Sequence, residues 1–201
     1  MFSPSHQALA DISVPNLEAY CKRHGYEMRI IHIENDNYAY KKHEAFKEWV
    51  QNDYFDILLY IDIDALIMNF NYKVEDFIND DECFCITADP NGLNGGVILL
   101  RNDTWGKLFN DFVLEQRNNY ENEQNIYDAF REHESVGRLI TVKPHPSFNQ
   151  YDYSLYIECK DRIGREDLGD FKEGNFIIHF PALSIENKIA MMQEYKEKII
   201  E

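Results

Sequence analysis

Two aspartates, Asp62 and Asp64, follow a run of apolar, β-branched and aromatic residues over 54–61. Such a run predicts a strand buried on both faces, and open α/β sheets bind ligands at the carboxyl ends of their strands. Residues i and i+2 of an extended chain point the same way, so both carboxylates can face one spot. Because two close carboxylates repel each other, they need a cation or a shared proton, and oxygen ligands suit Mg²⁺ and Mn²⁺.

The alternative without a function is that Asp62 and Asp64 simply lie at a solvated strand end, since short acidic patterns are common. Their position directly after an apolar strand favours a function, because charges there are unfavourable unless they are used or solvated. His179 lies in the apolar run 176–181. A lone histidine beside apolar residues is more often a core residue, but together with the two aspartates it becomes a third candidate ligand, because neutral imidazole suits Mn²⁺.

Further polar candidates lie where other predicted elements end or begin. Asp89 closes a strand-like run over 82–89, and Asn94-Gly95-Gly96 belongs to a loop predicted over 90–96. That loop is either a simple turn or a place where a sugar or phosphate can approach the backbone closely. Glu123 and Gln124 open a predicted helix, where Glu123 can simply favour the helix dipole.

Alternating strands and helices must position these residues. The periodicity predicts helices over 5–24, 40–50, 104–117, 123–133 and 185–199, and strands over 26–33, 54–61, 82–89, 97–100, 139–142 and 176–180. This alternation is typical of an α/β fold. With 201 residues, a single domain spanning 1–201 is expected. Because a helix begins almost at once and another runs to the last residues, we expect a piece of a longer protein, without its first strand.

The composition excludes several classes of protein. An apolar content of 44% excludes a disordered chain, and a formal charge of −16 makes nucleic acid an unfavourable partner. The four cysteines form no CxxC pair and read as reduced core residues. We see neither a signal peptide nor a membrane span, and we therefore expect a cytoplasmic protein (in the host cytoplasm if it is viral).

The ordered motifs resemble a nucleotide-sugar glycosyltransferase of the GT-A fold, closest to glycosyltransferase family 34. They read YIDIDALIMN over 60–69, NGGVILLRN over 94–102, NEQ over 122–124 and GNFIIHF over 174–180. The segment 5–26 is also similar to the part of that family that follows its first strand. The resemblance implies a Rossmann-like central mixed, mostly parallel sheet flanked by helices. It also implies transfer of a hexose from a UDP-sugar to a glycan hydroxyl, with Mn²⁺ or Mg²⁺ as cofactor and with retention of configuration.

The resemblance also implies roles for single residues. Asp64 would ligate the metal, and Asp62 would touch the metal or the ribose. His179 would complete the metal site. The donor sugar would be held by Asp89 and by the loop residues Asn94, Gly95 and Gly96. Glu123 or Gln124 would lie near the reacting carbon, and Lys42 (or Lys41) would approach the diphosphate.

One departure concerns the family's HxxG-like ending, which reads His179-Phe-Pro-Ala182 here, so a glycine is missing. The resemblance extends to enzymes of viral capsid glycans, which makes glucose or a 6-deoxyhexose such as rhamnose the expected donor sugar. The individual donor hydroxyl contacts cannot be read from the sequence.

Two other functions stay open at this point. A phosphatase of the haloacid dehalogenase type also has an Asp-x-Asp after an apolar strand. It requires Thr or Val where Leu66 stands, and the acidic pair Asp80-Asp81 comes too early for it. The third possibility is a sugar-nucleotide or glycan-binding module that kept the fold and lost turnover, because fold alone does not fix function.

Overall fold

The computed structural model describes residues 1–34, 40–52, 54–89, 91–144, 147–152 and 170–201. Contacts between Cα atoms divide the chain into two compact units. The first unit consists of Met1–Glu34, Ile61–Lys73 and Pro144–Glu201, and the second of Asn35–Tyr60 and Val74–Lys143. Of the four cysteines, Cys159 lies outside the described residues, and the other three are free thiols.

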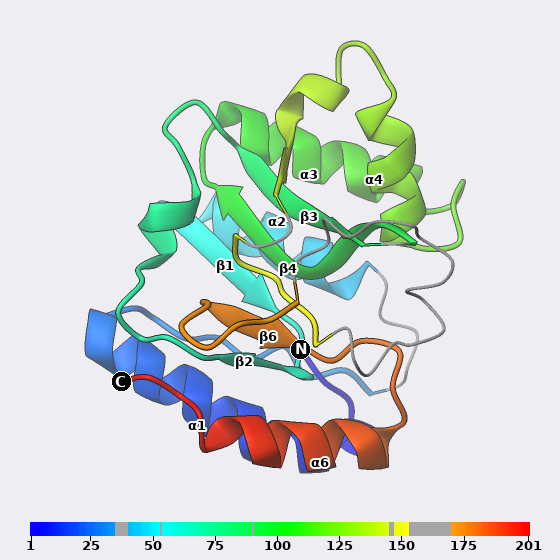
Figure 1. The fold of residues 1–201 in the computed structure, drawn as a ribbon. Helices are drawn as coiled ribbons and strands as arrows, with labels where there is room; N and C mark the ends of the chain where they lie inside the picture. Colours follow the sequence, from blue (N-terminus) through cyan, green and yellow to red (C-terminus); the bar gives the residue numbers. More distant parts are fainter. Residues whose placement is uncertain (35–39, 53, 90, 145–146, 153–169) are drawn as a thin grey trace. The chain divides into compact units, whose positions relative to one another are not determined.

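The second unit is built on a four-stranded sheet with the order β1-β4-β3-β5 (Figure 1). Its strands are β1 (Ile57–Ile61), β3 (Phe84–Asp89), β4 (Gly92–Arg101) and β5 (Ile140–Lys143). Strand β3 pairs antiparallel with β4 and parallel with β5. The mixed sheet and its flanking helices confirm the expected α/β class.

Three helices cover this sheet, and their sequences explain where they begin. They are α2 (Lys41–Gln51), α3 (Thr104–Gln116) and α4 (Glu123–Arg131), with short 3-10 turns at Val74–Phe77 and Gly137–Leu139. Asp103 caps α3 by accepting a bond from the Gly106 amide, and Asn122 caps α4 through the Asn125 amide. Helix α2 packs on α3, and α4 packs on β4.

The first unit pairs two short, fully buried strands, β2 (Ala65–Ile67) and β6 (Ile177–His179), in antiparallel register. The 3-10 turn η1 (Pro4–His6) leads into helix α1 (Gln7–His24), and the last helix is α6 (Ile185–Lys196). Asn16 on α1 bonds to both the amide and the carbonyl of Ile67, at 2.8 and 2.9 Å. These buried bonds fix α1 against β2.

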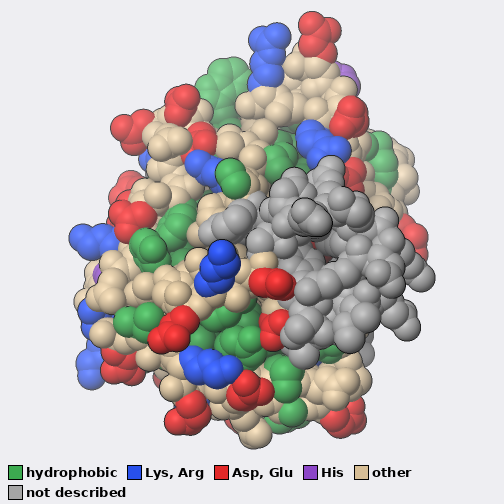
Figure 2. Space-filling view, in the orientation of Figure 1, with side chains coloured by type: hydrophobic (Ala, Val, Ile, Leu, Met, Phe, Trp, Pro, Cys, Tyr) green, Lys and Arg blue, Asp and Glu red, His purple; other side chains and the backbone are tan. Residues whose placement is uncertain are grey.

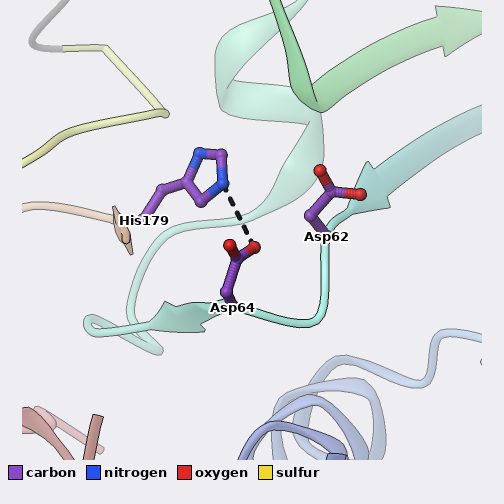
Figure 3. A group of neighbouring side chains, drawn as sticks. All are labelled: Asp62, Asp64 and His179. Atoms are coloured by element: carbon purple, nitrogen blue, oxygen red, sulfur yellow. Dashed lines mark ion pairs between the residues drawn. The ribbon is translucent and has the colours of Figure 1, made fainter. Parts of the chain in front are cut away.

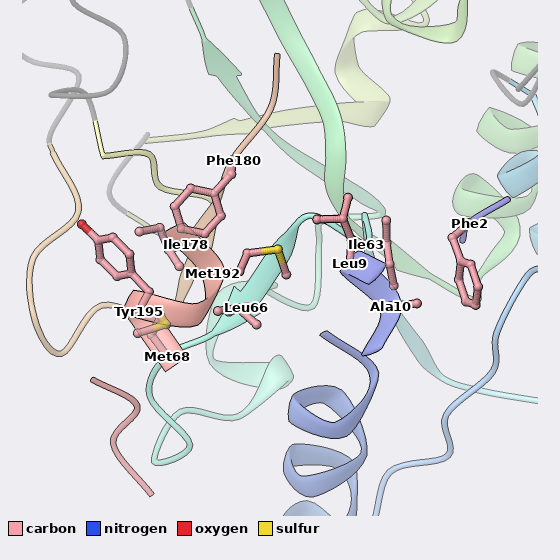
Figure 4. Packing of buried hydrophobic residues seen from close by; sticks show 10 residues of the cluster. All are labelled: Phe2, Leu9, Ala10, Ile63, Leu66, Met68, Ile178, Phe180, Met192 and Tyr195. Carbon is pink, nitrogen blue, oxygen red and sulfur yellow. The ribbon is translucent and has the colours of Figure 1, made fainter. Parts of the chain in front are cut away.

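An apolar core packs β2 and β6 against α1 and α6 (Figure 4). Leu66 and Ile178 contribute from the strands, Leu9 from α1 and Met192 from α6. All four side chains are buried completely, which makes this the stable base of the first unit. The polar residues that precede β2 and end β6 are therefore placed by well-packed strands.

Three expectations about strands need correction. Residues 26–33 form only one isolated bridge, between Phe2 and His32, because Pro4 begins a 3-10 turn and leaves the partner segment too short for a ladder. The strand over 54–61 is shorter and only half-buried at most positions of β1. The loop predicted over 90–96 is wrong from Gly92 onward, because β4 begins there.

The chain carries a formal net charge of −16. On the face drawn in Figure 2, acidic and basic side chains of the described residues are interspersed. Among the described residues, no helix is both long enough and apolar enough to cross a membrane.

Candidate functional site

A tight turn brings Asp62 and Asp64 to the start of β2. Strand β1 ends at Ile61, and the amide of Ala65 donates to the Asp62 carbonyl at 3.3 Å. The two aspartates therefore lie on a turn. The sequence argument had assumed that they lie on an extended strand, and this assumption was wrong. Their carboxylates still lie close together, because the turn is short: Asp62 stands at the end of β1 and Asp64 just before β2 (Figure 3).

The pairing of β2 with β6 places His179 beside this turn. Ala65 is the register partner of His179, and the Phe180 amide donates to the Asp64 carbonyl at 3.0 Å. One ligand atom from each of Asp62, Asp64 and His179 lies within 4.8 Å of the others. Figure 3 shows the His179 ring facing the Asp64 carboxylate, with Asp62 beside them at the end of β1. The structure thus brings together all three residues that the sequence proposed as metal ligands.

The ring of His179 is held from both sides. Its Nε2 lies 3.2 Å from Asp64 Oδ1, and its Nδ1 lies 3.2 Å from the side-chain oxygen of Asn149. A protonated Nδ1 can donate to this amide oxygen, and the contact holds the ring with Nε2 toward the carboxylate. Asn149 is completely buried. It had no local pattern by which the sequence could have revealed it.

Lys188 is a second residue that the sequence reasoning missed. Its Nζ lies 2.6 Å from Asp64 Oδ2, and the side chains of Lys188 and Asp64 are 14% and 11% exposed. Burial alone raises the pKa of Asp64, but the charges and hydrogen bonds of His179 and Lys188 outweigh it and hold this pKa well below its usual range. Asp64 is therefore a carboxylate at neutral pH, as a metal ligand must be.

The donor set suits a hard divalent cation. Two carboxylates and one imidazole offer two oxygens and one nitrogen, and carboxylates are the ligands that Mg²⁺ and Mn²⁺ prefer. The imidazole favours Mn²⁺ within this pair. Three protein ligands on one side leave further coordination positions for a substrate such as a diphosphate.

Ala182 occupies the position of the missing glycine. Its φ is 57°, and no other non-glycine residue in the described ranges has a positive φ. An L-residue in this left-handed region is strained, whereas glycine adopts it freely. The backbone thus keeps the conformation for which glycine is suited, although the side chain has changed.

In the second unit, Asp89 and Asn94 meet at the end of the β3–β4 hairpin. The Asn94 side-chain amide donates to Asp89 Oδ2 at 2.9 Å, and its oxygen accepts from the Gly96 amide at 2.9 Å. The register shifts here: Thr87 pairs with Asn94, but Ile86 pairs with Ile98. Residues 95–97 therefore bulge out of the ladder. Asn94, Gly95 and Gly96 therefore do interrupt the regular backbone as expected, but they do so as a bulge within β4 and not as a separate loop.

Lys42, Glu123 and Gly95 form a second buried group in this unit. Lys42 Nζ lies 2.7 Å from Glu123 Oε1 and 2.7 Å from the Gly95 carbonyl, and the Lys42 and Glu123 side chains are 4% and 14% exposed. A Cβ at Gly95 would lie 2.9 Å from Lys42 Nζ, so a side chain here would push the lysine out of its present position. Lys41 instead points outward and pairs with Glu44. Gln124, half-buried in the first turn of α4, is not part of this group.

A scan against protein families matches residues 77–190, more than half of the chain, to the galactosyl transferase GMA12/MNN10 family. An alpha-1,2-galactosyltransferase of Schizosaccharomyces pombe is 22% identical over 89% of this chain and 57% of its own length. A probable alpha-1,6-mannosyltransferase of Saccharomyces cerevisiae, MNN10, is 26% identical over 52% of this chain and 36% of its own. The chain spans little more than half the length of the first of these relatives, and less of the second.

Solved structures show the same fold. A glycosyltransferase involved in the glycosylation of the major capsid of PBCV-1 superimposes with a TM-score of 0.66 at 17% identity, covering 96% of this chain and 97% of the other. The galactosyltransferase LgtC, in complex with donor and acceptor sugar analogs, gives 0.58 at 14% identity, with coverage of 98% and 94%. These likenesses confirm the GT-A fold.

Proposed function

Because this chain belongs to the galactosyl transferase GMA12/MNN10 family, we propose that it transfers a hexose or deoxyhexose from a UDP-sugar to a glycan hydroxyl. The observation that carries the proposal is the convergence of Asp62, Asp64 and His179 within 4.8 Å. A chain with a net charge of −16 needs a cation to hold a diphosphate, and these residues fit one. We take Mn²⁺ as the first candidate and Mg²⁺ as the second.

The residues of the first unit would hold and orient the cation. Asp64, kept ionised by its neighbours, and Asp62 offer oxygens, while Asn149 keeps the Nε2 of His179 directed at the same point. When bound, the cation would supply Lewis-acid stabilisation of the charge that develops on the leaving diphosphate. Asp62 also remains a candidate contact to the ribose.

The residues of the second unit are proposed to bind the donor sugar. Asp89, Asn94 and the amides of Gly95 and Gly96 offer acceptors and donors for sugar hydroxyls, and the bulge lets a ligand approach the backbone. Glu123 and Gln124 are proposed to lie near the reacting carbon. The side chain of Lys42 is kept as a donor-binding candidate that acts through its contacts with Glu123 and Gly95.

We propose that transfer retains the anomeric configuration. The acceptor oxygen forms a bond to the anomeric carbon on the face from which the diphosphate leaves. The bond from that carbon to the phosphate oxygen breaks with its electron pair, and the acceptor proton passes to the leaving phosphate. No residue is assigned as a covalent nucleophile. The sugar passes through an oxocarbenium-like state that carbohydrate-binding carboxylates stabilise.

The proposal also covers the donor sugar, the acceptor glycan and the cellular compartment. The sequence led us to expect glucose or rhamnose, and the relatives' names add galactose and mannose as donors to be tested. A viral capsid glycan joins the acceptor panel because of the PBCV-1 enzyme. The buried free thiols of Cys83 and Cys85 support a reducing compartment, so we propose the cytoplasm. We also propose that residues 1–201 act as one glycosyltransferase domain of a longer protein.

The test is transfer from UDP-glucose, UDP-galactose, UDP-rhamnose and GDP-mannose to a panel of glycans, with Mn²⁺ or with EDTA. Asp64→Asn keeps the shape of the side chain and removes the charge, and we expect it to abolish transfer. Asp111→Asn is the matched control, because the pair that Asp111 forms with Lys47 is exposed. Equal transfer in EDTA, or full activity of Asp64→Asn, would contradict the mechanism. Donor binding with neither transfer nor hydrolysis would indicate the binding module instead.

A further inference from the structure

Each carboxylate oxygen of Asp64 faces a different nitrogen. His179 Nε2 lies 3.2 Å from Oδ1, and Lys188 Nζ lies 2.6 Å from Oδ2. Lys188 comes from the first turn of α6, whereas the proposed ligands follow β1 and end β6. At 14% exposure, the ammonium group of Lys188 is largely shielded from water. It is therefore a strong local partner of the carboxylate.

We propose that Lys188 competes with the divalent cation for Asp64 and so sets how tightly the metal binds. The inference rests on the metal site of the proposed function. An ammonium group and a divalent cation on the same buried carboxylate would repel each other at close range. Metal binding must therefore displace Lys188 from Oδ2.

The position of Lys188 permits this displacement. Its backbone is fixed, because its amide donates to the Ser184 carbonyl at 2.9 Å and Ser184 caps α6. Its four-carbon stem has several rotatable bonds, so the ammonium can leave Asp64 without a movement of α6. The lysine would thus act as the counter-ion of Asp64 whenever the metal is absent, and would give way when the metal arrives.

The competition has two opposite consequences for a Lys188→Met variant. Without metal, His179 is the partner that the Asp64 carboxylate keeps among the described residues, so the chelator-treated variant should unfold at a lower temperature, by about 5 °C or more. When metal is added, the variant has no lysine at position 188 to compete with the cation for Asp64. A like charge a few ångströms away shifts an ionic equilibrium about tenfold or more, so Mn²⁺ should bind the variant about tenfold or more tightly.

The experiment titrates MnCl₂ into chelator-treated wild type and variants by calorimetry and follows thermal unfolding with EDTA and with Mn²⁺. Lys188→Arg keeps the charge and should stay near wild type. Lys198→Met is the matched control, because Lys198 forms an exposed pair with Glu194, at 2.7 Å, just beyond the same helix. Tighter Mn²⁺ binding by Lys188→Met alone, with a lower unfolding temperature in EDTA, supports the competition.

Unchanged or weaker Mn²⁺ binding by Lys188→Met, while wild type binds through Asp64, overturns the competition and leaves the metal site standing. Failure of both proteins to bind Mn²⁺ overturns the metal site itself and the competition with it. If Lys188→Met does not fold in chelator, near-ultraviolet circular dichroism replaces calorimetry. Recovery of its signal with Mn²⁺ then supports the competition, and no recovery at millimolar Mn²⁺ overturns it.

Discussion

Lys42 offers a sharp test of how the second unit is held together. It is a lysine buried at the packing face of α2, with its ammonium between Glu123 Oε1 and the Gly95 carbonyl, each 2.7 Å away. Lys42→Met keeps most of the side-chain volume and removes the charge. The variant leaves the Glu123 carboxylate, only 14% exposed, without its cation, and leaves the Gly95 carbonyl without this donor.

The expected loss of stability follows from these two groups. Removal of one partner from a buried ion pair costs about 3–5 kcal/mol, because the other charge stays buried and unpaired. The lost bond to Gly95 is part of the same network, so it is not added separately. We expect Lys42→Met to lower the free energy of unfolding by about 3 kcal/mol, and the unfolding temperature by about 6–12 °C.

The assay is urea-induced unfolding of wild type, Lys42→Met and Lys41→Met. The neighbouring Lys41 is the matched control, because its pair with Glu44 is exposed and should contribute less than about 1 kcal/mol. The double variant Lys42→Met/Glu123→Gln should recover part of the loss, since no charge is then left unpaired. A loss for Lys42→Met as small as that for Lys41→Met would refute the buried pair.

Three further outcomes are expected. Ala182→Gly should relieve the left-handed strain and raise the free energy of unfolding by about 0.5–1 kcal/mol, and a loss in urea unfolding would count against that strain. Burial and the Lys42 charge lower the pKa of His43 from 6.5 to about 3, although the hydrogen bond between His43 and Asn110 acts in the opposite direction. Between these two pH values His43 therefore takes up a proton in the unfolded chain but not in the folded one. The free energy of unfolding should therefore fall as the pH is lowered from 6.5 toward 3. His43→Gln should reduce the slope of this fall by about 1.4 kcal/mol per pH unit. An unchanged slope would contradict the assignment to His43. Asn149→Ala should weaken Mn²⁺ binding about 10–100-fold by releasing the ring of His179, and calorimetry with wild-type affinity would remove Asn149 from the site.

Local patterns carried much of the fold. The 3.6-residue periodicity located α2, α3 and α4, and the caps Asp103 and Asn122 stand where the helices begin. The prediction of a strand over 26–33 was wrong because a strand needs a partner, and among the described residues only Phe2 forms a β-bridge with this segment. Pairing of this kind depends on distant parts of the chain, which a local alternation of side chains does not contain.

Some residues of the candidate site could be predicted from the sequence, and others could not. Asp62, Asp64 and His179 could be proposed because their residue types and their order along the chain match a known chemistry. Lys188 and Asn149 reach the same site from a helix and a loop with no motif of their own. The bridge between Gln150 and Ile178 brings Asn149 there, and the packing of α6 brings Lys188. Such contacts are tertiary, so sequence spacing cannot predict them.

The central claim is that Asp62, Asp64 and His179 hold a divalent cation that binds a nucleotide diphosphate. The most direct measurement is calorimetric titration of UDP into wild type and Asp64→Asn, each with Mn²⁺ and with EDTA. We expect UDP to bind wild type in Mn²⁺ and to bind neither wild type in EDTA nor Asp64→Asn in Mn²⁺. Equal UDP binding in EDTA, or undiminished Mn²⁺-dependent binding by Asp64→Asn, would contradict the account.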